Sequence, residues 1–141
     1  MRRLICGASL ILVLAFAAVW GGHADASDEK EPATIAEIMQ ALHKGSESPL
    51  ATLKAALKSD SPDWSVVQKA AKVYVECSSD LPKNDPPKGD SESFKKLAKA
   101  FASNAKSLKE AAEKQELAAA KDAFGKIGGS CMGCHKAHKP D

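Results

Sequence analysis

The sequence predicts an all-α protein, an antiparallel four-helix bundle. It has few runs of β-branched residues, no apolar–polar alternation and no Asn-Gly or Asp-Gly hairpin turn. Four segments instead repeat apolar residues at spacings of three and four, with lysines on the opposite side. A bundle buries four such stripes against one another, so it is the architecture that this pattern favours.

The first predicted helix is interrupted. In "TIAEIMQALHKG", Thr34 and Glu37 have the spacing of a capping box and Gly45 ends the segment. After the break "KGSESP", "SPLATLKAALK" offers Ser48 as a cap and Pro49 at the first helical position, where proline is favourable. We therefore expect one helix in two pieces.

Three further helices are predicted after this one. Ser61 and Pro62 are expected to start the second, and Ser91 is expected to cap the third. Between them, "PKNDPPKGD" (82–90) cannot continue a helix and is interpreted as a long connection without chemistry of its own. The stripes of the second, third and last helices are Trp64, Val67, Ala71, Tyr74 and Cys77; Phe94, Leu97, Phe101, Ala105, Leu108 and Ala112; and Leu117, Ala120, Phe124, Ile127, Cys131 and Cys134.

The N-terminus has the three parts of a secretory signal peptide. "MRR" is followed by the apolar run "LICGASLILVLAFAAVW", and Ala24-Asp25-Ala26 offers the small residues of a cleavage site. An uncleaved anchor is the alternative, but the run is short of the ~20 residues of a spanning helix. The prediction is a signal peptide over 1–26 and one domain over 27–141, in a periplasmic or otherwise exported protein, either free or tethered.

The charge is nearly balanced. The chain has 20 Lys and Arg residues against 18 Asp and Glu residues, a net charge of +2. Lysines are spread over every segment, whereas nucleic-acid binding needs a concentrated basic patch. Nucleic acid is therefore not an expected partner.

The end of the chain, "GGSCMGCHKAHKPD", carries the motif with chemical content. A redox dithiol is disfavoured because the cysteines lie near a helix C-terminus, which raises thiol pKa values. Zinc is disfavoured because Cys131, Cys134, His135 and His138 share one stripe of one helix and cannot surround an ion. Covalent haem fits, since Cys-x-x-Cys-His is the c-type attachment signature and an exported chain is compatible with it.

With this motif at the end of an all-helical chain, "AFGKIGGSCMGCHKAHK" (123–139) resembles the last helix of the cytochrome c prime family. The resemblance implies a four-helix bundle with one covalent haem c near the C-terminal end of the last helix. Cys131 and Cys134 match the thioether cysteines, and His135 matches the proximal iron ligand. Lys139 matches a frequent basic residue, and His138 replaces a frequent aromatic.

The chain departs from the family in two ways. Family members commonly have arginine near the haem propionates, whereas residues 27–141 contain none, and Lys44 is a candidate substitute. The first helix is also interrupted. The interruption blurs the alignment of this segment with the family's unbroken first helix.

The sixth iron position decides the function. Met39 and His43, at i and i+4, project from the same face of the first helix. Met39 is the favoured ligand because "IM" and the turn after it resemble the family's low-spin, six-coordinate members. His43 and an open position remain alternatives.

Histidine–methionine ligation fills the iron's coordination shell and suits electron transfer. We therefore expect an electron carrier with redox partner proteins, not an enzyme. A five-coordinate binder or sensor of small gases such as NO and CO is the alternative, and a peroxidase, with only His43 as a distal polar residue, is disfavoured. Cys77 is interpreted as a small core residue, with an intermolecular disulfide in a homodimer as the alternative.

Overall fold

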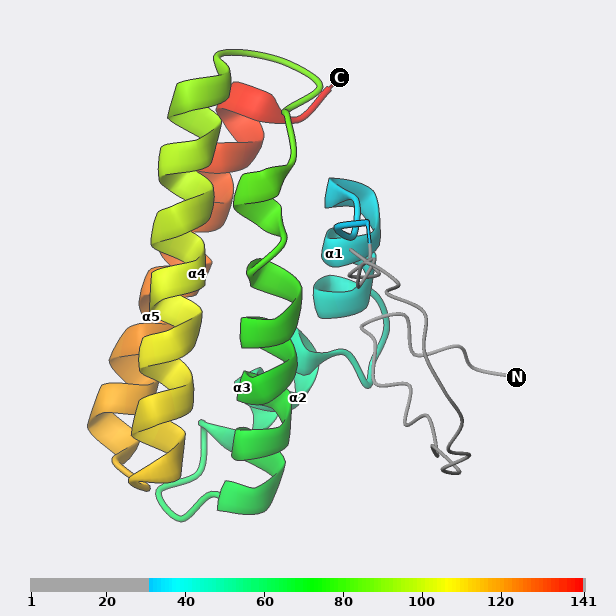
Figure 1. The fold of residues 1–141 in the computed structure, drawn as a ribbon. Coiled ribbons are helices and arrows are strands. Elements are labelled where there is room, and N and C mark those ends of the chain that lie inside the picture. The colour runs from blue at the N-terminus through cyan, green and yellow to red at the C-terminus, as the bar shows by residue number, and fades with distance from the viewer. Residues whose placement is uncertain (1–30, 141) are drawn as a thin grey trace, which may run out of the picture.

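The computed structural model describes residues 31–140, and every regular element within that range is helical (Figure 1). The all-α prediction is therefore confirmed. The predicted signal peptide over 1–26 lies outside the described residues. The elements in chain order are α1 (Ile35–His43), α2 (Pro49–Ala56), α3 (Trp64–Ser78), the short 3₁₀ helix η1 (Leu81–Lys83), α4 (Ser91–Glu113) and α5 (Leu117–His138).

The predicted interruption of the first helix and its caps are confirmed. The Glu37 amide donates to Thr34 Oγ1 over 3.3 Å, and the Thr34 amide donates to Glu37 Oε2 over 2.9 Å. Ser48 caps α2, with Pro49 as the first helical residue. Gly45 follows α1 with a φ of 98°, a left-handed conformation that suits glycine.

The predicted caps of α3 and α4 were wrong, because aspartates take the place of the expected serines. Asp63 Oδ1 accepts from the Ser65 amide over 2.9 Å, and Asp90 Oδ2 accepts from the Ser93 amide over 2.7 Å. A carboxylate satisfies these free N–H groups as a hydroxyl does, and its charge also interacts favourably with the helix dipole. Ser91 is the first residue of α4.

The predicted apolar stripes form the core. Helices α3, α4 and α5 pack side by side along their lengths, and α4 turns into α5 through Gln115 at a φ of 57°. Tyr74, Leu108 and Ile127 are at most 1% exposed. The fold is therefore the expected bundle, in which α1 and α2 both pack along α3 in place of one continuous helix.

Helix α1 is held differently from the rest. Ile38 and Leu42 are fully buried, and the main contacts of α1 are with α2 and α3 (Figure 1). It does not pack closely against α4 or α5. No helix within residues 31–140 has the length and apolar character needed to cross a membrane.

Candidate haem site

A cavity of about 690 Å³ lies between α1, the connection after α3, α4 and α5. Its volume is within the range of small-molecule and cofactor sites. Apolar side chains from three helices form much of its wall: Ile35 and Met39 of α1, Phe94, Leu97, Ala98 and Phe101 of α4, and the motif residues of α5. The cavity thus separates α1 from the two longest helices.

The C-terminal motif forms one wall, near the end of α5 as predicted. Cys131, Cys134 and His135 all line the cavity, and both thiols are free and half-buried. Burial raises the pKa of both thiols, and Cys131 raises the pKa of Cys134 further. The direction is the expected one, although burial is its largest cause. Cys77 lies in the hydrophobic core, outside this wall, so it does not complete a zinc site with the motif.

The opposite wall carries both candidate distal ligands, Met39 and His43. Burial lowers the pKa of His43, and the charge of His135 lowers it further, while a hydrogen bond with the Met39 backbone raises it. The His43 ring is therefore favoured in its neutral form. Its Nε2 is buried and finds no hydrogen-bond partner within residues 31–140.

Tyr74 shows which residues of the two walls lie near each other. The His43 ring meets the Tyr74 ring edge-on at 6.2 Å, and burial together with Cys131 raises the pKa of Tyr74. Tyr74 is thus close to both His43 and Cys131. Helices α1 and α5 run in opposite directions (Figure 1). Met39 and His43 both line the cavity opposite the motif residues, and His135 is near enough to His43 to lower its pKa.

His138 closes the far end of the cavity. It is 4% exposed, its ring meets the Phe94 ring edge-on at 5.5 Å, and its Nδ1 lies 3.0 Å from the Lys88 carbonyl oxygen. The position that the family often fills with an aromatic thus holds a buried aromatic ring here too. It fastens the end of α5 to the connection before α4.

The connection over 82–90 was expected to carry no chemistry, but it forms part of the cavity wall through Asn84, Asp85 and Pro87. No sequence signal marked these residues, because prolines and glycine indicate only where a helix ends. Lys44, the candidate for the missing arginine, is the exposed C-cap of α1 and is not in the wall. Lys139 is in the wall.

The residues around the cavity fit a haem. An apolar space suits the porphyrin, and two thiols and His135 stand together on one wall. On the other wall, His43 has a buried nitrogen that finds no hydrogen-bond partner among the described residues. Cys131 and Cys134 would hold the group and His135 would face its iron. Such a group supplies one-electron exchange between ferric and ferrous iron.

Comparison with known proteins agrees with this site. Residues 88–139 match the family model described as Cytochrome C'. The crystal structure of cytochrome c' from Thermochromatium tepidum is similar, with a TM-score of 0.56 and 25% sequence identity over 66% of this chain and 84% of that chain. Comparison with curated proteins gives no match.

The fold and the site resemble those of a haem-binding c-type cytochrome built on a four-helix bundle. Within this class the resemblance to the cytochrome c prime family is confirmed, and that family binds covalently attached haem c with its iron. The family match begins at residue 88 and does not include α1. It therefore leaves the distal side of the haem undefined.

Proposed function

We propose that the protein is an exported electron carrier. One haem c is bound through thioethers to Cys131 and Cys134, with His135 as the proximal ligand and Met39 as the distal ligand. The iron passes single electrons between redox partner proteins, and the protein is not an enzyme. Histidine–methionine ligation raises the reduction potential and leaves no vacant position for a substrate.

The position of Met39 carries this proposal. Met39 lines the cavity from α1 and His135 lines it from α5, so a haem attached to α5 would lie between the two walls. The thioether of methionine is a soft ligand that suits haem iron. Helix α1 does not pack closely against α4 or α5, which leaves room for a flat cofactor.

His43 has a supporting role in this arrangement. Its ring hydrogen-bonds the Met39 backbone and packs against Tyr74, and His135 lowers its pKa. Its buried Nε2 has no partner within the described chain, so His43 is the alternative distal ligand.

Gas binding is the second candidate function. The observation that favours it is the arrangement of α1, a helix of nine residues that contacts mainly α2 and α3. A distal ligand on such a helix is displaced more easily than one on a long, fully packed helix. NO or CO would then bind the iron in place of Met39.

The spectrum of the haem protein tests the ligand assignment. We expect a low-spin ferric spectrum with a methionine–iron charge-transfer band. Met39→Leu keeps the volume of the side chain, so it should cost less than ~1.5 kcal/mol of stability while removing the band and lowering the reduction potential.

His43→Ala is the matched control and should keep the band. A low-spin spectrum that survives Met39→Leu and is lost in His43→Ala would assign the ligand to His43. A high-spin wild-type spectrum that changes readily with CO would instead favour the gas-binding function.

A further inference from the structure

Helix α1 depends on contacts made before its first residue. A helix of nine residues is too short to be stable alone in water. Only Ile38 and Leu42 of α1 are fully buried, and the main contacts of α1 are with α2 and α3. Additional interactions are therefore needed to fix where α1 stands across the cavity.

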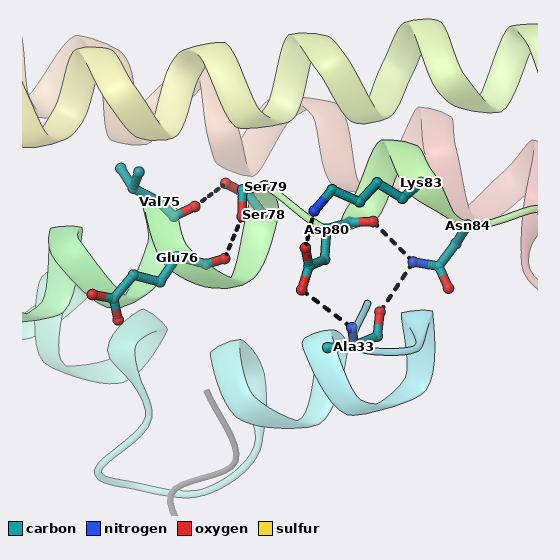
Figure 2. A network of polar contacts seen from close by, with 8 residues as sticks. All are labelled: Ala33, Val75, Glu76, Ser78, Ser79, Asp80, Lys83 and Asn84. Carbon is teal, nitrogen blue, oxygen red and sulfur yellow. Dashed lines mark hydrogen bonds and ion pairs between the residues drawn. The ribbon is translucent and has the colours of Figure 1, made fainter. Parts of the chain in front are cut away.

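Two side chains at the end of α3 and η1 provide them (Figure 2). The Ala33 amide donates to Asp80 Oδ2 over 3.1 Å, and Asn84 Nδ2 donates to the Ala33 carbonyl oxygen over 3.0 Å. Both backbone groups of Ala33 are thus held by residues 47 and 51 positions away. We call Asp80, Asn84 and Ala33 the α1 clamp.

Further contacts hold the side chains of Asp80 and Asn84 in place. Asn84 Nδ2 also donates to the Asp80 carbonyl oxygen over 2.9 Å, so both of its hydrogens are used. Lys83 Nζ lies 2.7 Å from Asp80 Oδ1, which holds the carboxylate in place. Each side chain thus makes two contacts, and this fixes its orientation as well as its position.

The clamp is joined through the backbone to the cavity wall that carries Met39 and His43. Ala33 immediately precedes the cap residue Thr34, whose capping box stiffens the first turn of α1. Met39 is four residues beyond Ile35, the first residue of α1, which is about 6 Å along the helix at 1.5 Å per residue. A shift at Ala33 is therefore carried to Met39 as a movement of the whole helix.

We propose that Asp80 and Asn84 are positioning residues of the haem site, which set the distance of α1 from the iron and the ease with which the distal ligand leaves it. This inference rests on the proposed distal ligation by α1. It assigns the control of ligand exchange to residues outside both α1 and the haem motif.

The test compares CO binding to ferrous haem protein in variants of the clamp. Asn84→Ala removes both donors of the amide and should raise the CO association rate on the order of tenfold, equivalent to ~1.4 kcal/mol, with a gain of high-spin ferric haem. Asn84 also lines the cavity, whereas Asp80 does not. Asp80→Ala should therefore raise the CO association rate and the high-spin fraction without altering the cavity wall. Asp80→Asn keeps an acceptor for the Ala33 amide, so it should largely restore both values.

Ser79→Ala is the matched control. It removes a hydrogen bond of 2.8 Å from Ser79 Oγ to the Glu76 carbonyl oxygen, next to the clamp but without contact to α1 (Figure 2). If Asn84→Ala and Asp80→Ala bind CO as Ser79→Ala does, the positioning role is overturned while Met39 ligation stands.

A high-spin wild-type spectrum would instead show that the proposed distal ligation is wrong. Hydrogen exchange of the α1 amides then decides the inference. Faster exchange in Asn84→Ala than in Ser79→Ala supports the clamp, and equal exchange overturns it.

Discussion

Gly89 is the residue on which the closed end of the cavity depends. Its φ is 82°, and a Cβ added there would lie 2.7 Å from the Ala137 carbonyl oxygen and 2.8 Å from His138 Nδ1. Both neighbours are held, the first by the helix and the second by its contacts with Lys88 and Phe94. Glycine at this position therefore allows the connection to approach the end of α5.

Replacing Gly89 by alanine should destabilise the protein by about 2–3 kcal/mol, because it adds a steric clash to a left-handed conformation. Gly45 is the matched control. Its φ is 98°, but a Cβ there meets nothing within 4 Å, so Gly45→Ala should cost only about 1 kcal/mol. Urea unfolding of the haem protein measures both, and equal losses would argue against a close approach at Gly89.

At the scale of elements, the N-terminal caps of α1 and α3 include the carboxylates of Glu37 and Asp63, and the charge of these groups affects stability. Hydrogen bonds from Ser65 and Val66 lower the pKa of Asp63, and Thr34 lowers the pKa of Glu37 in the same way. A carboxylate whose pKa is lower in the folded state stabilises the fold above its unfolded pKa. This contribution is lost as the pH falls through the folded pKa.

The stability of α3 should therefore decrease on acidification below about pH 4, the ordinary range of an aspartate. Asp63→Asn keeps a capping side chain that does not titrate. The difference in urea midpoint between wild type and this variant should shrink or change sign between about pH 4 and pH 2. Because Glu37 also titrates, only the difference is informative, and a constant difference would contradict the role of the Asp63 charge.

At the scale of the whole molecule, the bundle consists of a packed part and a part that the cofactor completes. Helix α4 packs against α3 and α5, and Ile38 and Leu42 of α1 join the same core, whereas the cavity separates α1 from α4 and α5. When nothing fills an apolar cavity of this size, the side chains that line it on both sides lose packing contacts. Haem is thus expected to be a structural component as well as the redox group.

The double variant Cys131→Ala and Cys134→Ala should prevent covalent attachment and leave α1 loosely held. Limited proteolysis should then cleave within residues 35–48, while α3 to α5 remain resistant and most of the helical circular dichroism is kept. The wild-type haem protein is the control. Resistance of α1 in the haem-free variant would mean that the distal wall forms without the cofactor.

Much of the fold follows from local sequence signals. The capping box of Thr34, the Ser48 cap, the apolar stripes and the place of the motif at the end of α5 were all predicted, because each is encoded within a few residues. The same locality explains the errors at α3 and α4. Serine and aspartate cap equally well, and at each helix start the sequence offers both within two residues of each other.

The tertiary structure decided the surroundings of the motif. The sequence by itself determined an all-helical chain with Cys131 and Cys134 on the apolar stripe of the last helix and His135 directly after them, and it selected Met39 and His43 as candidates for the other side. The burial of His138, the wall formed by the connection and the α1 clamp join residues about 50 positions apart. Such contacts depend on how the helices pack, and helical periodicity specifies which face is buried but not which distant residue it meets.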